Sequence, residues 1–399
     1  MGAVHPNRNR LLSWMSLRGN RILSEQVRYR LKRSLRYAKP DINAMSKSPT
    51  SSHPAPGRIL VIRTDRLGDV VLSTPVLTTL REQYPESYIA LMVAPFTREL
   101  VENHPALNHL MIDDAKGLHK GISGFFRLVN EIHRHHFDTV MLLHPTLRLA
   151  MACRLAGVPH RLGTGYRGYS LLFNHRVFEH RKNAQRHEVD YNLSLVQALT
   201  GEQVSGSPNI RATDEARQSI KKRLRQWGLE PGHFAVLHPG SSGSARDWPA
   251  DSFTALGTKL IQSGIQVIIT GGKQESHLIQ HMVDRMPVPP ITAVGDLSIK
   301  ELTALLEMAA ICITNSTGPL HIAAAVDTST VALFCPITPC SPIRWGPYGG
   351  NHKVLTPEVP SCPRCIEEAC PYFDCMIRIS VDSVFEAVQD VLATSNHCR

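Results

Sequence analysis

The chain has 399 residues, a length that favours two domains. Of these residues 42% are hydrophobic and 20% charged, a composition typical of a globular protein. No apolar run reaches the ~18 residues that a transmembrane helix needs, and no hydrophobic segment with a small-residue cleavage site follows the polar N-terminus. We therefore expect a cytoplasmic protein without a membrane span or a secretory leader.

The net charge of +10 is concentrated in the N-terminal segment. Residues 1–57 contain eleven Lys or Arg and two acids, Glu25 and Asp41, and so carry +9 of the +10. The nearly neutral remainder argues against nucleic-acid binding by the folded body. Residues 11–38 predict a basic helix with an imperfect apolar side, which is either a membrane-surface helix or a weakly helical tail. Residues 39–57 are rich in Pro and Ser and predict a flexible linker.

The segment 58–80 predicts a strand, a loop and a helix. Residues 59–62 form a β-branched apolar run that suits a strand buried on both faces of a parallel sheet. The loop over 63–69 holds two carboxylates and two guanidinium groups, and such a loop is where open α/β sheets bind ligands. At the helix start, Asp69 is either a helix N-cap or an acid–base residue over the crevice.

An α/β pattern continues through the first half of the chain. Strands alternating with helices predict βαβ units and a parallel sheet. The histidines near 133–136 lack a supporting Cys or carboxylate pattern and are best explained as a solvated helix end. The polar residues 181–230 look helical and predict the inter-domain region. We expect strands at 88–93, 110–112 and 139–143, and helices at 96–103 and 122–135 and, after His144-Pro145, through Ala156.

A second α/β series starts at residue 234. Its loops at 238–244, 271–275 and 315–319 are rich in Gly, Ser and Thr and follow predicted strands. Small residues at helix starts let backbone N–H groups approach the anionic oxygens of a diphosphate. The sequence therefore predicts two Rossmann-like domains facing a cleft. We expect strands at 234–237, 266–270, 310–314 and 330–334, and helices at 251–263, 299–308, 321–326 and 383–393.

Four groups of residues carry a family resemblance. The chain resembles the heptosyltransferases of glycosyltransferase family 9, which build the inner core of bacterial lipopolysaccharide, from residue 58 to about 392. The matching residues are Arg58-Ile-Leu-Val-Ile-Arg63 with Leu67-Gly68-Asp69 and Thr74-Pro75, His187-Glu188, His238-Pro239-Gly240 with Arg246-Asp247-Trp248-Pro249, and the run from Asn315 through Gly318-Pro319-Leu320-His321 to Ala325.

The resemblance implies an α/β GT-B fold, in which two Rossmann-like domains enclose the active site. Residues 58–215 correspond to the acceptor domain and 216–399 to the nucleotide-sugar donor domain, after the extension and linker at 1–57. It also implies a metal-independent, inverting transfer of heptose from ADP-heptose to a lipopolysaccharide core-type acceptor, without a cofactor for catalysis. Such a glycolipid acceptor would place the enzyme at the inner face of the cytoplasmic membrane, where the basic N-terminal segment can bind peripherally.

Site residues follow from the same resemblance. Asp69 matches the aspartate that acts as the family's general base. Many family members have Asp where this chain has Ser316, and this departure leaves the donor sugar open. His321 either contacts the donor or packs in the core. The other donor-binding candidates are Ser241, Ser242, Arg246, Glu275, Thr317 and Gly318, and the candidates for an anionic acceptor are Arg63, Arg66 and Arg148, with Arg161 and Arg167.

Four cysteines cluster near the C-terminus with the spacing C-x₂-C-x₄-C-x₄-C: Cys362, Cys365, Cys370 and Cys375. Four thiolates this close can hold a structural Zn or Fe ion, and iron-containing relatives of the family carry similar clusters. The opposing interpretation is a reduced cluster that binds no metal.

Three further functions are compatible with the sequence of the whole chain. The same fold can transfer another nucleotide sugar to a different surface glycan or to a protein. A degenerate site would make the chain a non-catalytic protein that binds a nucleotide sugar or a metal, although Asp69 and the loop at Thr317 and Gly318 argue against this. A sugar-nucleotide epimerase shares the two-domain fold, but it needs catalytic acids in the cleft besides Asp69.

Overall fold

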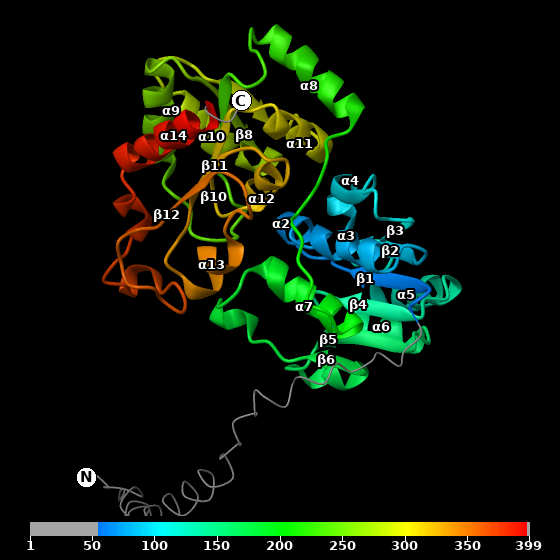
Figure 1. Cartoon of the computed structure of the whole chain (residues 1–399). Coiled ribbons are helices and arrows are strands. Elements are labelled where there is room, and N and C mark those ends of the chain that lie inside the picture. The colour runs from blue at the N-terminus through cyan, green and yellow to red at the C-terminus, as the bar shows by residue number, and fades with distance from the viewer. Residues whose placement is uncertain (1–54, 397–399) are drawn as a thin grey trace, which may run out of the picture. The chain divides into compact units, whose positions relative to one another are not determined.

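The structure, a computed structural model, describes residues 55–396 and contains two parallel six-stranded sheets (Figure 1). The first sheet has the strand order β3-β2-β1-β4-β5-β6 and the second β12-β11-β10-β7-β8-β9. Numbered within its own half, each sheet has the order 3-2-1-4-5-6 of a dinucleotide-binding fold. The prediction of two Rossmann-like halves is confirmed. The basic helix predicted at 11–38 and most of the linker lie outside the described residues.

The first half alternates strands and helices from residue 58 to residue 200. Its strands are β1 (Arg58–Ile62), β2 (Tyr88–Val93), β3 (His109–Ile112), β4 (Thr139–Leu142), β5 (His160–Thr164) and β6 (His175–Val177). Its helices are α2 (Leu67–Val71), α3 (Thr74–Gln83), α4 (Arg98–Val101), α5 (Gly121–Arg134), α6 (Leu147–Leu155) and α7 (Glu188–Thr200), with short 3-10 turns η3 (Pro95–Thr97), η4 (Gly168–Leu172) and η5 (Arg181–Asn183).

The second half runs from α8 (Asp214–Gln226) to α14 (Val381–Asn396). Its strands are β7 (Phe234–His238), β8 (Gln266–Gly271), β9 (Ile291–Val294), β10 (Ile311–Asn315), β11 (Thr330–Leu333) and β12 (His352–Leu355). The helices between them are α9 (Ala250–Gln262), α10 (Ser276–Val283), α11 (Ile299–Glu307), α12 (Gly318–Ala325) and α13 (Pro342–Trp345), with 3-10 turns η6 (Lys273–Glu275), η7 (Thr338–Cys340), η8 (Glu367–Ala369) and η9 (Cys375–Arg378).

Strand β1 shows why the first sheet is buried on both faces. Its side chains alternate in direction, so Ile59 and Val61 pack into the layer formed by α2, α3 and α7. Leu60 and Ile62 point to the other face, where α5, α6 and η4 form the opposite layer. The continuous apolar sequence of β1 is what two covered faces require.

The two halves meet through α2 and α12. A Cβ atom added to Gly68 would lie 2.4 Å from Cδ2 of His321, and one added to Gly318 would lie 3.0 Å from Leu67. Only glycine allows backbones to approach this closely. Apolar residues of both halves form one continuous cluster around this contact.

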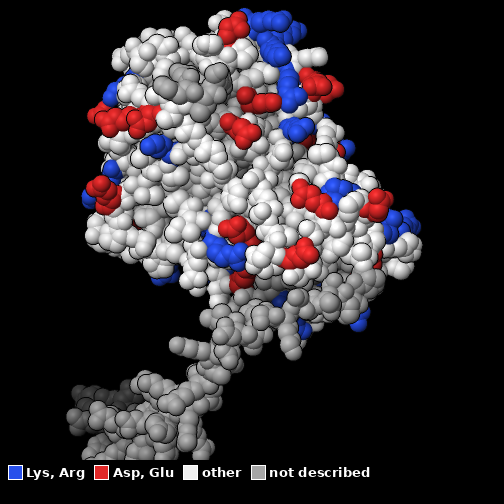
Figure 2. Space-filling view, in the orientation of Figure 1, with Lys and Arg blue, Asp and Glu red and all other residues white. Residues whose placement is uncertain are grey.

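Charge on the surface is mixed in sign over most of the face in Figure 2, where Lys and Arg gather most densely over α8. In the described part of the chain, no helix is both long and apolar enough to span a lipid bilayer.

Candidate functional site

A pocket of about 820 Å³ opens between the carboxyl ends of the two sheets. The first half contributes the loop after β1, the loop after β4 and the segment from Thr164 to Lys182. The second half contributes Ser244, the start of α12 and residues around α13. Its position matches the rule that open α/β sheets bind ligands at the strand ends where the strand order reverses.

Asp69 lies in the pocket wall on α2, one residue after the close contact at Gly68. The N-cap of α2 is Arg66, and no side chain caps this helix, so Asp69 is free of the capping role that the sequence left open. Burial and the neighbouring carboxylates Asp65 and Glu188 raise the pKa of Asp69 to about 6, against the opposing effect of Arg63. A carboxylate with this pKa can accept a proton near neutral pH.

Arg63 joins the carboxylates of the loop after β1. Its side chain is only 2% exposed, and its Nε donates to Oδ1 of Asp65 at 2.7 Å. One terminal nitrogen forms a short ion pair with Asp69, and the other contacts Oε1 of Glu188 at 3.1 Å. Arg63, predicted to contact the acceptor, therefore donates mainly to carboxylates within the protein, and one of these is Asp69.

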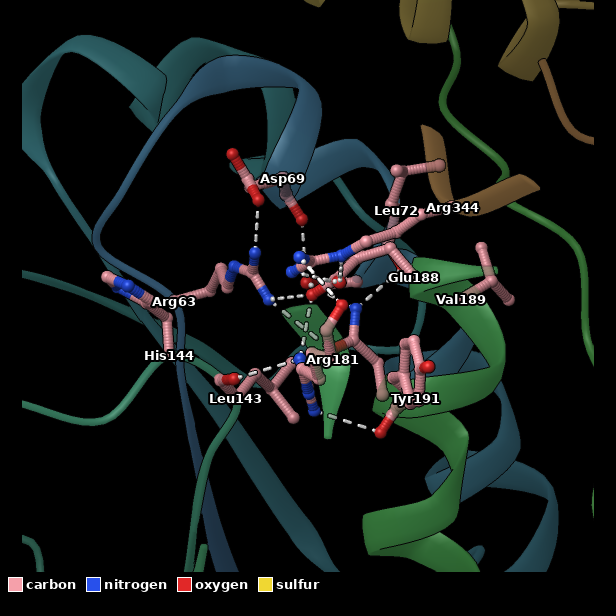
Figure 3. A network of polar contacts seen from close by, with 12 residues as sticks. Arg63, Asp69, Leu72, Leu143, His144, Arg181, Glu188, Val189, Tyr191 and Arg344 are labelled. Carbon is pink, nitrogen blue, oxygen red and sulfur yellow. Dashed lines mark hydrogen bonds and ion pairs between the residues drawn. The ribbon is translucent and has the colours of Figure 1, made fainter. Parts of the chain in front are cut away.

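Glu188 is the centre of this network, which Figure 3 shows from close by. Its side chain is 0% exposed and contacts three guanidinium groups: Arg181 at 2.7 Å, Arg344 at 2.9 Å and Arg63. Burial alone would raise the pKa of Glu188, but the three arginines outweigh it and lower the pKa to about 2. The carboxylate of Glu188 is therefore ionised at neutral pH.

Two contacts of α7 tie the first half to the second. Arg344 of α13 donates from Nε to Oε2 of Glu188 at 2.9 Å and from a terminal nitrogen to the carbonyl of Arg181 at 3.1 Å. The backbone N–H of Val189 donates to Nδ1 of His187, so Nε2 carries the proton and donates to the carbonyl of Gly346 at 3.0 Å. The network thus links Asp69, through Arg63 and Glu188, to Arg344 in the second half.

The start of α12 forms the second half's wall of the pocket. Ser316, Thr317, Gly318 and His321, four of the predicted donor-binding residues, all line the pocket. Oγ of Ser244 donates to the carbonyl of Ser316 at 2.8 Å and so joins the loops after β7 and β10. His321 is buried, its Nδ1 has no partner among the described residues, and burial lowers its pKa to about 3.

Three further donor candidates lie near this region but do not line the pocket. Ser241 is buried and Ser242 has φ of 50°, both in the turn after β7. Oε2 of Glu275 accepts from the N–H of Gly272 at 2.7 Å, and its other oxygen lies where a Cβ atom of Gly240 would stand. Glu275 therefore packs between the loops after β7 and β8.

Arg246 and Arg148, predicted to bind the donor and the acceptor, do not line the pocket and have partners within the protein. Arg246 donates to Sγ of Cys365 at 3.1 Å and lies 3.5 Å from a carboxylate oxygen of Asp374, on the side of the cysteine cluster. Arg148 forms a two-pronged ion pair with Asp113 at 2.7 and 2.9 Å. Arg66 does line the pocket, and its side chain is exposed.

The four clustered cysteines surround a small cavity of about 50 Å³. Backbone N–H groups of Glu367 and Tyr372 donate to the sulfurs of Cys365 and Cys370 at 3.4 Å each. Even so, within residues 55–396 no three His, Cys, Asp or Glu side chains are arranged to hold a metal ion. The side chains of Cys362, Cys365, Cys370 and Cys375 are therefore not gathered into a metal site in this structure.

Several residues of the site carried no assignment from the sequence. His144 follows β4, lies in the pocket wall and contacts Asp65 at 3.5 Å. Arg181 and Lys182 in η5 and Arg344 in α13 also line the pocket, although each lies in a segment without a strong motif. The pair His187-Glu188 was a usable signal, because it marks the start of α7.

The contact at Gly68 gives a first prediction. We expect Gly68→Ala to lower kcat/KM by about 10²-fold, because its methyl group would displace the buried His321 and misalign the two pocket walls. Kinetics of the reaction that the resemblance implies would measure this loss. Gly168→Ala is the matched control, since nothing lies within 4 Å of its added Cβ atom, and equal losses in both variants would contradict the role of this contact.

Comparisons with known proteins agree with this geometry. The profile of glycosyltransferase family 9 (heptosyltransferase) matches residues 125–374. A Haemophilus influenzae protein named "Putative glycosyltransferase" is 26% identical over 330 residues, which cover 78% of this chain and 91% of the relative. Lipopolysaccharide heptosyltransferase 3 of Escherichia coli is 25% identical over 291 residues, covering 71% of this chain and 84% of the relative.

A solved structure gives the same result for the fold. The crystal structure of a family 9 glycosyl transferase from Veillonella parvula superposes with a TM-score of 0.74 at 26% identity, covering 85% of this chain and 97% of that protein. The family profile covers more than half of the chain, and the GT-B architecture agrees over both sheets. The chain therefore belongs to glycosyltransferase family 9, the heptosyltransferases, and is a glycosyltransferase of the GT-B fold.

Proposed function

We propose that this enzyme transfers heptose from ADP-heptose to a lipopolysaccharide core-type acceptor, with inversion at the anomeric carbon and Asp69 as the general base. The observation that carries the proposal is Asp69 itself. It lies in the pocket with a pKa raised to about 6, and α12 of the other half starts in the same pocket. The heptose donor and the acceptor class rest on the family and its named relatives.

In the proposed reaction, the acceptor hydroxyl oxygen attacks the anomeric carbon of the donor while Asp69 takes the hydroxyl proton. The bond between that carbon and the diphosphate oxygen breaks, and ADP leaves with the electron pair. Attack opposite the leaving group inverts the configuration. A positioned base of this kind contributes about 10²–10⁴-fold to the rate.

The departing diphosphate needs hydrogen-bond donors and positive charge to stabilise the negative charge that develops on its oxygens. The start of α12 offers both, because Thr317 and Gly318 line the pocket with their backbone N–H groups and the N-terminal end of the helix dipole favours negative charge. Arg66 and Lys182 line the same pocket with exposed side chains and can neutralise further charge. We propose that these protein groups let the transfer proceed without a metal ion.

Ser316 bears on the choice of sugar. It is largely buried in the pocket, and its carbonyl is held by Ser244. A serine offers a neutral hydroxyl where a carboxylate would accept strongly from sugar hydroxyls. Transfer of another nucleotide sugar to a different surface glycan or protein is therefore the alternative function.

The domain assignments remain part of the proposal. We propose that the sheet of β1–β6 belongs to the acceptor domain, the sheet of β7–β12 to the donor domain, and that the boundary near residue 215 lies at the first turn of α8. A glycolipid acceptor would bring the enzyme to the cytoplasmic face of the membrane.

The test is turnover of ADP-heptose by the full chain with a Kdo–lipid A acceptor in the presence of EDTA. We expect ADP release that requires the acceptor and persists in EDTA. Release only with a different nucleotide sugar would support the alternative function. ADP binding without release for every donor would contradict the proposal of an active transferase, and loss of turnover in EDTA would contradict metal independence.

A further inference from the structure

An outward surface of the first half combines apolar and basic side chains. It lies on α5, α6 and η4, the layer that covers one face of the first sheet. The residues of this layer that point inward are buried, among them Leu128 and Ile132 of α5 and Leu149 of α6. We call the outward surface the α5–α6 face. Its exposed apolar residues are Ile122, Phe126, Leu147, Met151, Leu155 and Leu171.

These side chains are far more exposed than a core would tolerate. Ile122 is 80% exposed, Phe126 58% and Leu171 79%. On α5 and α6 they repeat every four residues, at 122 and 126 and at 147, 151 and 155, so each helix presents an apolar stripe to solvent. Contiguous exposed apolar side chains on a soluble domain mark an interaction surface.

The charges of the α5–α6 face are mostly positive. Arg127 and Arg134 of α5 and Arg154 of α6 are exposed, and Glu131 is the one acid in these three helical segments. The acidic Glu131 is half-buried, and its Oε2 contacts Nε2 of the buried His119 at 3.2 Å. An apolar surface ringed by arginines fits the interface of an anionic lipid bilayer.

Two occupants from this chain itself fit less well. The N-terminal segment 1–57 carries eleven Lys or Arg against two acids, so it would meet a surface of its own sign. A second copy of the same face would also bring like charges together. Neither offers the anionic groups that these arginines require.

The face also adjoins the pocket. Leu147 starts α6 directly after the loop at His144 and Pro145, which lines the pocket. The hydroxyl of Tyr169 in η4 donates to the carbonyl of Pro145 at 2.7 Å and joins η4 to the same loop. A bilayer at this face would therefore lie beside the first half's wall of the pocket.

We propose that the α5–α6 face docks the enzyme on an anionic membrane surface. Docking here would present the headgroup of a membrane-embedded acceptor to the pocket, and this last step rests on the proposed function. The docking itself does not, because it depends only on apolar and basic side chains outside the pocket.

The test is sedimentation of the full chain with vesicles of phosphatidylethanolamine and phosphatidylglycerol. We expect the triple variant I122S/F126S/L155S to bind at least about tenfold more weakly than wild type, because it removes buried apolar area at the interface. The triple variant L278S/V288S/V354S is the matched control, since it removes three exposed apolar side chains from the other half.

A second variant tests the charges. R127E/R134E/R154E should also lose binding to these vesicles, and wild type should bind vesicles of phosphatidylcholine weakly. Unchanged melting temperatures would show that all variants fold. Equal binding of the face variant and the matched control would overturn the proposal and assign binding to the N-terminal segment. Conversion of a dimer to a monomer by the face variant, without vesicle binding, would overturn it in favour of a protein interface.

Discussion

Asp69→Asn should lower kcat by about 10²–10⁴-fold while leaving ADP binding nearly unchanged. The amide keeps the size of the side chain and a contact for Arg63, but it cannot accept the proton of an attacking hydroxyl. Although α2 packs against the start of α12, the amide adds no bulk there and leaves the groups of α12 unchanged, so the affinity for ADP should change little. Single-turnover transfer and ADP titration would separate the two effects.

Asp65→Asn is the matched control for this experiment. Asp65 lies in the same loop, also lines the pocket and also pairs with Arg63, at 2.7 Å. We expect it to lose far less activity than Asp69→Asn. A larger loss at Asp65 than at Asp69 would show that the base has been assigned to the wrong carboxylate.

The pH profile gives a further check on the same residue. A base must be deprotonated to act, and the pKa of Asp69 is raised to about 6. The value of kcat/KM in wild type should therefore be level above this pH and fall about tenfold per pH unit below it. A plateau that continues down to pH 4 would mean that another group takes the proton.

The buried strands were predictable from the sequence because their composition is dictated by burial on both faces. β1 and β2 are continuous apolar runs, and the strand predicted at 88–93 has the observed bounds. The strands β5, β6, β9 and β12 carried no such signal. They contain polar, partly exposed residues such as His160, Arg176 and Lys353, and three of them have only three or four residues.

Residues at motifs that fix the backbone could be placed in the pocket wall from the sequence, whereas the partners of long side chains could not. Asp69 and Gly318 hold positions at helix starts, and both line the pocket. Arg246 and Arg148 have long, flexible side chains, which donate to Cys365 and Asp113, respectively. Sequence spacing cannot rank such partners, because they come from segments distant in the chain. For the same reason the sequence did not predict the contact of Arg344 with Glu188, which lies 156 residues away in the chain.

Glu188→Gln should be among the most destabilising single substitutions in the pocket. The carboxylate is fully buried among Arg63, Arg181 and Arg344, so the amide would leave buried guanidinium charges without compensation. Breaking a buried ion pair from one side costs about 3–5 kcal/mol. We expect a loss of this size in the free energy of unfolding at pH 7, measured by urea denaturation. Glu86→Gln, at an exposed acid, should change it by less than about 0.5 kcal/mol.

The pH dependence of the free energy of unfolding shows whether the charge of Glu188 causes this loss of stability. The pKa of Glu188 is lowered to about 2 from its ordinary 4.5, so its stabilising contribution is complete above pH 4.5 and is lost as the pH falls toward 2. The difference between wild type and Glu188→Gln should therefore be constant from pH 7 to about 5 and shrink in stronger acid. A difference independent of pH throughout this range would mean that packing, and not the carboxylate charge, sets the loss.

The same variant should also lose activity beyond its loss of stability. Arg63 forms an ion pair with Asp69, and Arg344 lies in α13. Both arginines also form ion pairs with Glu188. Without the carboxylate, Asp69, the proposed base, loses its fixed orientation and the second half loses an ion pair to α7. We expect kcat to fall even at temperatures where the variant is fully folded, with the pH midpoint near 6 displaced because the charge next to Asp69 has changed. A different result is a variant that is folded and slow while the midpoint of its pH profile stays near 6. That result would mean that the network holds the two halves of the pocket together and does not set the pKa of Asp69.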